Sequence, residues 1–237
     1  MLVNIKNLLR NSFFHPRYLA QHELWSLIES EGFQLTGKLL DVGCGHKPYQ
    51  SLLRCINEYI GLDVPSSMHG LDQVDVIGTS MSLPFMENCF DSLLCTEVLE
   101  HVPEPMAALR EMARVAKTGG LLLLSAPLSE QLHEEPYDFY RYTCHGLIYL
   151  LNKTGWNVLN IKTRGGVWLE MGYRFSSFLY TSIGAKRTAN GGLQPRLVIG
   201  PIVILACTLI QGSAWVLNRM WKSDLSTIGY GVLAQKK

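Results

Sequence analysis

Apolar residues in the first two thirds of the chain come in short runs with helical patterns between them. Runs at 38–42, 58–63, 74–77, 90–95 and 120–126 have the length of buried strands. Residues 47–55 and 104–117, which lie between such runs, have the spacing of helices that cover a sheet. Strands that alternate with helices predict an α/β fold with a mostly parallel sheet and helices on both faces.

The same pattern continues toward the C-terminus. Thr143 is suited to cap a helix that contains Leu147, Leu150 and Leu151, and Gly155 ends that helix before a strand at 156–162. A last strand is expected at 228–234. Residues 165–222, between these two strands, are too long and too apolar for an ordinary connection.

This insertion contains a segment of membrane-spanning length. Residues 197–217 include no charged side chain, and Arg196, Arg219 and Lys222 flank them. A single crossing would separate the last strand from its sheet, so only an even number of crossings, a re-entrant hairpin or a surface-lying helix agrees with the pattern.

The first half of the insertion is poorly suited to cross a membrane as a second helix. Residues 167–183 are interrupted by Glu170 and Arg174, which favours an interfacial or half-inserted helix pair. Gly200 and Pro201, and later Gln211 and Gly212, suit a bent second segment, and Lys186, Arg187 and Arg196 are suited to anionic headgroups. The alternatives are a lid over a pocket and a dimer interface with a second copy of the chain.

Composition narrows the class of protein. The 21 basic and 20 acidic residues leave a formal charge of +1, so no net field attracts nucleic acid. The six cysteines form no zinc pattern and no CxxC pair, which favours reduced thiols in the cytoplasm. Residues 1–14 carry Lys6 and Arg10 within an apolar pattern and are expected to form a short amphipathic helix rather than a secretory signal.

The first strand leads into a glycine turn, Asp41-Val42-Gly43-Cys44-Gly45. Glycine permits unusual backbone angles and a close approach to a ligand at the carboxyl end of the strand. Asp63 closes the next strand 18 residues after Gly45, at the spacing of a carboxylate that binds ribose hydroxyls. Pro48 replaces the third glycine of a dinucleotide site, so a nucleoside cofactor without a pyrophosphate fits better than NAD or FAD.

Three further motifs follow in order: Leu83-Pro84-Phe85, Phe90-Asp91 and Glu97-Val98-Leu99-Glu100-His101-Val102. With the glycine turn, they resemble the small-molecule branch of the class I S-adenosylmethionine-dependent methyltransferases, the type with a Leu-Glu-His signature. The resemblance covers about residues 36–165 and the last strand. It implies a Rossmann-like fold with a seven-stranded sheet, to which the insertion before the last strand is added.

The resemblance also implies which residues contact the cofactor, S-adenosyl-L-methionine. Asp41, Gly43 and Gly45 are assigned to its methionyl part and Asp63 to its ribose. Thr79, Ser80 and Met81 are assigned to its adenine, and Thr96 and Glu97 to the neighbourhood of its sulfonium. Many relatives carry an aspartate at the position of Thr79, so here a hydroxyl or a backbone carbonyl would contact the adenine amino group.

Methyl transfer needs in-line positioning and removal of the acceptor's proton. His101 is a candidate base, although it is equally suited to hold the Glu100 loop; His133 is a second candidate base. An alternative is that Glu97, Glu100 and His101 bind a divalent metal ion, as the pattern resembles metal-dependent O-methyltransferases of quinone biosynthesis and of small-RNA ends. Metal-independent relatives share the pattern, so a metal is not favoured.

Residues 133–143 follow the fifth strand and are the expected acceptor loop. Four aromatic side chains suit a sugar ring, a quinone or a lipid head, and Glu134, Glu135 and Arg141 are candidates for its polar groups. A surface loop with local packing is the alternative.

Three parts are therefore expected: an N-terminal helical cap at 1–36, a cofactor-binding domain at 37–165 and 223–237, and a hydrophobic helical insertion at 166–222. The favoured function is O-methylation of a small, hydrophobic or lipid-linked acceptor by a cytoplasmic protein attached peripherally or monotopically to a membrane. The alternative is a membrane-associated partner protein that binds the cofactor without turnover.

Overall fold

The computed structural model describes residues 12–68, 70–187 and 193–237. They divide into two compact units, one comprising Trp25–Lys162 and Gly229–Lys237, the other the described residues up to Leu24 and Thr163–Ile228. The amphipathic helix expected at residues 1–14 falls almost wholly outside the described residues. The functional boundaries expected at 36, 165 and 222 remain predictions.

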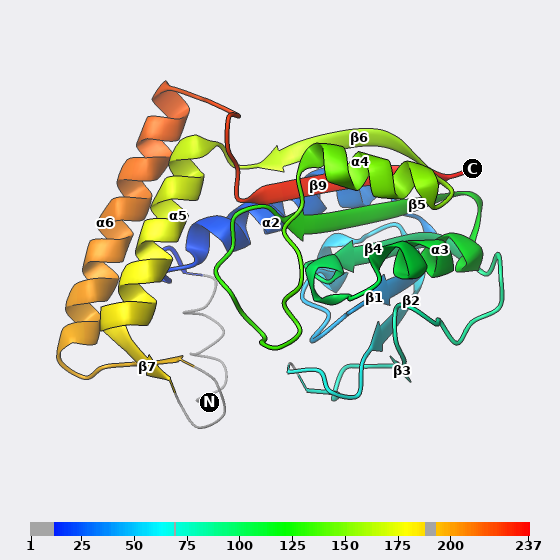
Figure 1. Ribbon diagram of the computed structural model, residues 1–237, viewed down its shortest axis with the longest axis horizontal. Coiled ribbons are helices and arrows are strands. Elements are labelled where there is room, and N and C mark those ends of the chain that lie inside the picture. Colours follow the sequence, from blue (N-terminus) through cyan, green and yellow to red (C-terminus); the bar gives the residue numbers. More distant parts are fainter. Residues whose placement is uncertain (1–11, 69, 188–192) are drawn as a thin grey trace. The chain divides into compact units, whose positions relative to one another are not determined.

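The first unit contains a seven-stranded sheet in the order β3-β2-β1-β4-β5-β9-β6 (Figure 1). The pairings from β3 to β5 are parallel, whereas β9 runs antiparallel to β5. This confirms the mostly parallel, Rossmann-like α/β fold. The strands are β1 Gly37–Val42, β2 Ile56–Asp63, β3 Val76–Ile77, β4 Phe90–Thr96, β5 Ala116–Pro127, β6 Trp156–Arg164 and β9 Gly229–Lys236.

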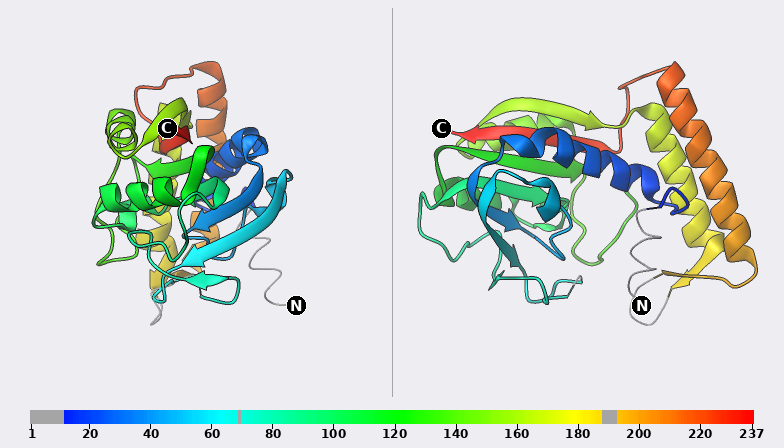
Figure 2. Two further views of the ribbon diagram at one scale, coloured as in Figure 1. Left: turned by 90° about the vertical axis from the view of Figure 1, so that its right-hand side faces the viewer. Right: turned by 180° about the vertical axis from the view of Figure 1, so that it is seen from behind.

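Helices cover both faces of this sheet. Helices α3 (Pro105–Val115) and α4 (Cys144–Lys153) lie on one face, and the C-terminal half of α2 (Tyr18–Glu31) lies on the other (Figure 2). Leu122 and Leu124 of β5 join the core cluster with α3 and α4, while Leu123 between them is equally buried. Because neighbouring residues of a strand point to opposite faces, the run of leucines is explained by burial on both sides.

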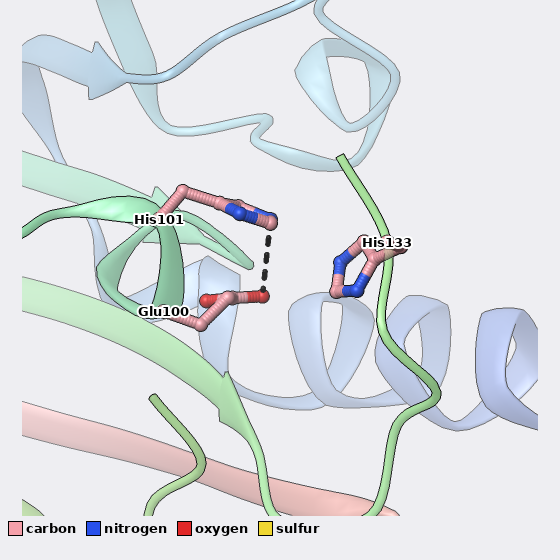
Figure 3. Close-up of side chains that lie close together, drawn as sticks. All are labelled: Glu100, His101 and His133. Carbon is pink, nitrogen blue, oxygen red and sulfur yellow. Dashed lines mark ion pairs between the residues drawn. The ribbon is translucent and has the colours of Figure 1, made fainter. Parts of the chain in front are cut away.

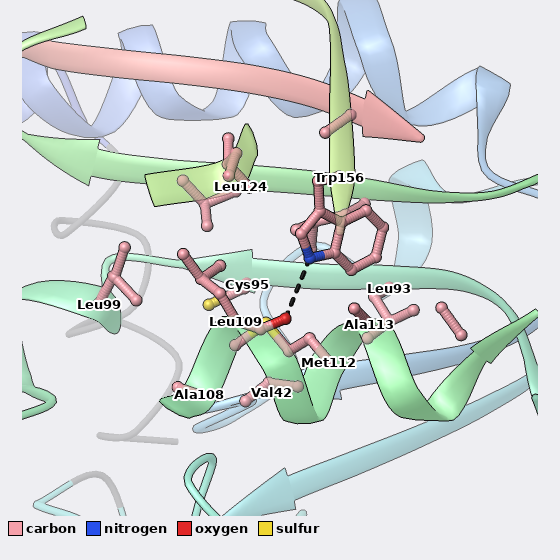
Figure 4. Close-up of a cluster of buried hydrophobic side chains, with 14 of the residues drawn as sticks. Val42, Leu93, Cys95, Leu99, Ala108, Leu109, Met112, Ala113, Leu124 and Trp156 are labelled. Carbon is pink, nitrogen blue, oxygen red and sulfur yellow. Dashed lines mark hydrogen bonds between the residues drawn. The ribbon is translucent and has the colours of Figure 1, made fainter. Parts of the chain in front are cut away.

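Two local interactions fix the covering helices. The Thr143 hydroxyl accepts a hydrogen bond from the Gly146 amide at 3.1 Å, which confirms the expected N-cap of α4. The Trp156 indole N–H of β6 donates to the Leu109 carbonyl of α3 at 3.0 Å inside the core (Figure 4). This bond satisfies the one polar group of a fully buried tryptophan.

The helix expected at 47–55 is wrong. This stretch contains a single 3₁₀ turn, η2 (Gln50–Leu52), between the glycine turn and β2. Lys47 has a φ of +51° and belongs to the turn, Pro48 follows it, and β2 begins at Ile56. The few residues left between Pro48 and Ile56 are too few for a stable α-helix.

The fifth strand begins earlier than expected. Strand β5 starts at Ala116 and contains an irregularity, since Ala116 pairs with Phe90 and Leu121 pairs with Ser92. The Gly119-Gly120 pair lies inside this bulge, and Gly119 has a φ of +79°.

The second unit is built around two helices, α5 (Val167–Leu179) and α6 (Ile199–Met220). A π-helical turn (Tyr180–Gly184) follows α5, and a two-stranded ribbon, β7 (Ala185–Arg187) and β8 (Leu193–Pro195), leads to α6. Gly172 of α5 faces Ala214 of α6 so closely that a Cβ on Gly172 would lie 2.4 Å from that of Ala214. Among the described residues, α6 is the one helix long and apolar enough to span a membrane by length and composition.

Candidate functional site

The glycine turn is tied to the end of β2 at the carboxyl edge of the sheet. The amides of Gly43 and Cys44 donate to the Leu62 carbonyl at 2.8 and 3.1 Å. The Gly45 amide donates to Asp63 Oδ2 at 2.9 Å, and Asp63 Oδ1 accepts from the Val64 amide at 2.7 Å. The two residues assigned by resemblance to methionine and ribose binding, Gly45 and Asp63, are therefore in direct contact.

Gly43 is required by the geometry of this turn. Its φ is +75°, and a Cβ there would lie 2.3 Å from Val98 Cγ2. Val98 follows β4, so the turn after β1 packs directly on the loop after β4.

Asp41 is a buried carboxyl group with one free oxygen. Its Oδ2 accepts a hydrogen bond from the Tyr59 phenol, whereas its Oδ1 has no hydrogen-bond partner among the described residues. Burial, reinforced by the nearby Asp63 carboxylate, raises the pKa of Asp41 to about 7, although the Tyr59 bond and Lys47 oppose the shift. Oδ1 thus keeps its capacity for a donor such as an ammonium group.

Three residues that the sequence analysis missed support Asp41: Tyr59, Lys47 and Asp75. The Lys47 ammonium lies 2.5 Å from Asp75 and 5.5 Å from the centre of the Tyr59 ring. Asp75 also accepts from the Gly61 amide at 2.7 Å. Tyr59 and Gly61 are two residues apart on β2, and Gly61 pairs with Asp41, so the period of two in a strand indicates that Tyr59 shares a face with Asp41.

The segment assigned to adenine is a short turn before the Leu83-Pro84-Phe85 motif. The Thr79 hydroxyl accepts from the Met81 amide at 3.3 Å, while Ser80 is buried and Met81 packs against the core. The Thr79 hydroxyl can still donate to a ligand.

The Leu83-Pro84-Phe85 motif is fixed from α3. Arg114 donates to the carbonyls of Phe85 and Leu83 at 2.8 and 2.9 Å, and Glu111 accepts from the Leu83 amide at 2.8 Å. Arg114 and Glu111 are themselves paired. The residues directly after the segment assigned by resemblance to adenine are therefore anchored to α3.

Glu97, directly after Thr96 at the end of β4, is in the left-handed region with a φ of +53°. Its Oε1 accepts from the Ser125 hydroxyl at 2.8 Å, and its amide donates to the Ser125 carbonyl at 3.2 Å. A non-glycine residue held at positive φ is typical of functional sites. These bonds tie the end of β4 to β5 beside the glycine turn.

His101 and His133 lie side by side next to the buried Glu100 (Figure 3). The two ring centres are 4.7 Å apart, and His101 Nε2 is 3.9 Å from Glu100 Oε1. His101 Nδ1 lies 2.8 Å from the Tyr137 carbonyl and His133 Nδ1 lies 3.0 Å from the Gln131 carbonyl. Because a carbonyl only accepts, each neutral ring carries its proton on Nδ1 and leaves Nε2 as the basic atom.

The structure groups potential metal ligands differently from the sequence expectation. Ligand atoms of Glu100, His101 and His133 lie within 4.8 Å of one another. Among the described residues, Glu97 is not part of this group, and its carboxylate accepts a hydrogen bond from Ser125. The residues suited to hold a divalent ion are therefore one carboxylate and two imidazoles.

The acceptor loop is anchored on the turn η3 (Leu99–His101). The amides of Phe139 and Tyr140 donate to the Glu100 carbonyl at 2.9 and 3.2 Å, and the Tyr142 hydroxyl donates to the Leu99 carbonyl at 2.9 Å. Tyr137, Phe139 and Tyr140 remain exposed. The loop that contains His133 is thus hydrogen-bonded to the turn that contains His101.

Arg141 does not have the role suggested by its position in the loop. Its guanidinium donates to Asp138, to its neighbour's carbonyl and to the carbonyls of Glu130 and Gln131, which uses all five N–H groups. Asp138 also accepts from the His133 amide, and the Arg141 bond holds its pKa at about 2. Arg141 therefore fixes the loop and His133 rather than an acceptor.

Residues 40–124 match the family model of the methyltransferase domain, which places β1, the glycine turn and β4–β5 within one known unit. These residues form a methyltransferase domain, and the fold of the chain is that of S-adenosylmethionine-dependent methyltransferases. Its relatives include a demethylmenaquinone methyltransferase of Staphylococcus epidermidis, 29% identical over 140 residues that cover 50% of this chain and 58% of that protein. A ubiquinone biosynthesis O-methyltransferase of Xanthomonas oryzae is 37% identical over 100 residues, 37% of this chain and 42% of that protein. The match thus spans about half the length of these relatives.

Solved structures resemble the methyltransferase domain in fold. A methyltransferase from Archaeoglobus fulgidus aligns over 98% of this chain and 99% of that one, with a TM-score of 0.54 and 17% identity. The [4+2]-cyclase SpnF aligns over 90% and 79%, with a TM-score of 0.54 and 20% identity. Since one neighbour is a cyclase, the fold alone does not define the reaction.

The residues present fit S-adenosylmethionine. The cofactor carries positive charge on its sulfonium and ammonium groups, and Asp41, Asp63 and Glu97 meet at the same edge of the sheet. The Oδ1 of Asp41, which has no hydrogen-bond partner among the described residues, suits its methionyl end.

Proposed function

We propose that the protein is an enzyme that transfers the methyl group of S-adenosylmethionine to an oxygen of a small, hydrophobic or lipid-linked acceptor at the cytoplasmic surface of a membrane. The cofactor supplies an electrophilic methyl group. The chain supplies a binding edge, an acceptor loop and a base.

The strongest support for this proposal comes from Asp41. A buried, half-satisfied Asp41 lies at the strand edge where the Gly45 amide contacts Asp63. A buried acceptor without a partner costs about 1–3 kcal/mol, so its retention is best explained by a ligand that stabilises it.

His101 is the proposed base. Its Nδ1–H donates to the Tyr137 carbonyl, which orients Nε2 and leaves it able to accept a proton from an acceptor hydroxyl. The Glu100 carboxylate at 3.9 Å stabilises the imidazolium that results. His133, held by Gln131 and by the Asp138 bond to its amide, is placed to receive a proton or to orient the acceptor.

A hydrophobic acceptor is supported by two features. Tyr137 and Phe139 present exposed aromatic faces on the acceptor loop, and α6 presents an exposed apolar surface. The relatives named above are, by their names, a demethylmenaquinone methyltransferase and an O-methyltransferase of ubiquinone biosynthesis, and a quinone ring or a lipid-linked sugar matches these aromatic faces.

The test is transfer of tritiated methyl from S-adenosylmethionine into lipid extracts by the full chain. Label in an organic-soluble product that depends on His101 supports the proposal. Cofactor binding without label in lipid or in quinone precursors would favour a non-catalytic, cofactor-binding partner protein.

A further inference from the structure

We propose that α6 lies flat in the headgroup region of a bilayer, its exposed apolar stripe toward the acyl chains, and does not cross the membrane. The inference rests on the proposed membrane-surface function and specifies how attachment occurs. The partner of the apolar stripe on α6 is a lipid surface with anionic headgroups.

The stripe extends along most of the helix, from Ile202 to Met220, and Ser213 is the exposed polar residue within it. Turning by 100° per residue places Ile202, Leu205, Leu209, Val216 and Met220 on one side of α6, and each is exposed by half or more. The opposite side carries Val203, Cys207 and Ala214, which are buried against α5 and its neighbours. An apolar face of this length on the outside of a helix is typical of a surface that meets a partner or a lipid.

The charge of this segment complements anionic lipid. Residues 163–228 contain seven basic and two acidic residues, whereas the whole chain has a charge of only +1. Four of the basic residues lie near the ends of α6: Lys186 and Arg196 precede it, Arg219 lies in its last turn and Lys222 follows it. Each cation close to an anionic surface contributes about 1 kcal/mol of attraction.

A buried polar side chain in the middle of α6 binds the first turn of α2 and the segment before it, and this contact argues against a helix that crosses the bilayer. Gln211, fully buried, accepts from the Leu19 amide at 3.2 Å and donates to the His15 carbonyl at 3.1 Å. It thereby caps the first turn of α2. If α6 crossed, this segment, including Arg17, would sit at the centre of the bilayer, where an arginine costs about 2.5–3.5 kcal/mol or more.

The other elements of this unit are also unsuited to a crossing. Helix α5 has 13 residues, or about 20 Å, against a hydrocarbon core of about 30 Å. The β7–β8 ribbon that joins the helices has open edges, and such edges do not occur in contact with hydrocarbon. An in-plane arrangement keeps the ribbon, with Lys186 and Arg196, at the headgroups.

Flotation of the full chain with phosphatidylcholine vesicles, with and without phosphatidylglycerol, tests the attachment. We expect binding that increases with phosphatidylglycerol and a loss on the order of tenfold for the double variant Leu205→Glu/Leu209→Glu. Lys186→Gln/Arg196→Gln should weaken only the dependence on the anionic lipid. Tyr149→Glu, an equally exposed apolar side chain on α4, is the matched control and should bind normally.

Depth measurements separate the in-plane arrangement from a crossing. Spin labels on Ile202→Cys, Leu209→Cys and Val216→Cys, in a chain whose Cys55, Cys89 and Cys144 are serine, should report one shallow depth. A depth that increases sharply at residue 209 would overturn the proposal. No vesicle binding, or a dimer that Leu209→Glu dissociates, would overturn it as well.

A failure of the proposed membrane attachment can be distinguished from a failure of the proposed methyltransferase function. Calorimetry with S-adenosylhomocysteine measures the methyltransferase domain without lipid. The Leu205→Glu/Leu209→Glu variant should retain cofactor binding, so intact binding without flotation contradicts only the membrane attachment.

Discussion

The ionisation of Asp41 is set by opposing interactions within the proposed site. Burial and the Asp63 carboxylate favour its protonated form, while the Tyr59 bond favours the ionised form. A cationic cofactor next to Oδ1 would favour ionisation. Protonation and cofactor binding are therefore coupled at this residue.

The stability of the protein without cofactor should decrease between about pH 4 and pH 7 through Asp41. Its folded pKa is about 7 against an ordinary 3.8, so in this range the native state retains a proton that the unfolded state has released. The stabilisation is complete below about pH 4 and is lost as pH rises through 7. Urea unfolding should show that Asp41→Asn removes a few kcal/mol of this dependence; equal slopes in both proteins would contradict the assignment.

Gly43→Ala should destabilise the protein more than Gly119→Ala. Both glycines have positive φ, so both variants pay about 1 kcal/mol for the backbone conformation. Only Gly43 adds a clash, 2.3 Å from Val98, whereas the nearest atom to a Cβ on Gly119 is 3.9 Å away. Chemical unfolding should show a further cost of about 1–3 kcal/mol for Gly43→Ala, and equal costs would mean that the turn relaxes freely.

His101→Gln should lower the rate of methyl transfer by about 10²–10⁴-fold while cofactor affinity is retained. Steady-state kinetics and calorimetry measure the two effects. His145→Gln, an exposed histidine on α4, is the control and should be fully active.

A chelator distinguishes a base from a metal ligand at this position. Activity that survives a chelator supports the base. Activity that is lost and then restored by magnesium would instead assign Glu100, His101 and His133 to a metal ion.

At this scale, the sequence located the principal residues but not their partners. The contact between Gly45 and Asp63 agrees with the spacing, since both end neighbouring strands. Tyr59 and Asp75 were missed because their role depends on strand register. His133 lies beside Glu100 and His101 because its loop folds back onto η3. No local sequence pattern predicts that contact.

At the scale of elements, the strands were predicted more accurately than the connections. Runs of apolar residues buried on both faces leave a strong signal, as in Leu121–Leu124. The expected helix at 47–55 failed because the left-handed Lys47 and the following Pro48 extended the glycine turn. Local turn geometry therefore overrode helical spacing.

The packing of α5 on α6 depends on Gly172. A Cβ there would lie 2.4 Å from Ala214 Cβ, so Gly172→Ala should destabilise the chain by about 1–3 kcal/mol despite the higher helix propensity of alanine. Gly212→Ala, where the nearest atom is 3.6 Å away, should be neutral or stabilising by up to about 1 kcal/mol. Thermal unfolding compares the two, and changes of the same sign would contradict the close contact.

At the scale of the whole molecule, the chain joins a methyltransferase domain to a basic, apolar helical unit. The sequence indicated the insertion by its length and lack of charge, but the choice between crossing and in-plane attachment depended on Gln211. Its bonds to Leu19 and His15 join residues about 190 positions apart, which periodicity alone does not reveal.

Isothermal titration of the full chain with S-adenosylmethionine and S-adenosylhomocysteine tests the central claim most directly. We predict saturable binding at one site, weakened by on the order of tenfold or more in Asp63→Ala, which loses the carboxylate assigned to the ribose. Gly119→Ala, at the opposite end of the sheet, should bind as the unaltered chain does. No heat from the folded chain with either compound, or unchanged affinity in Asp63→Ala, would contradict the account.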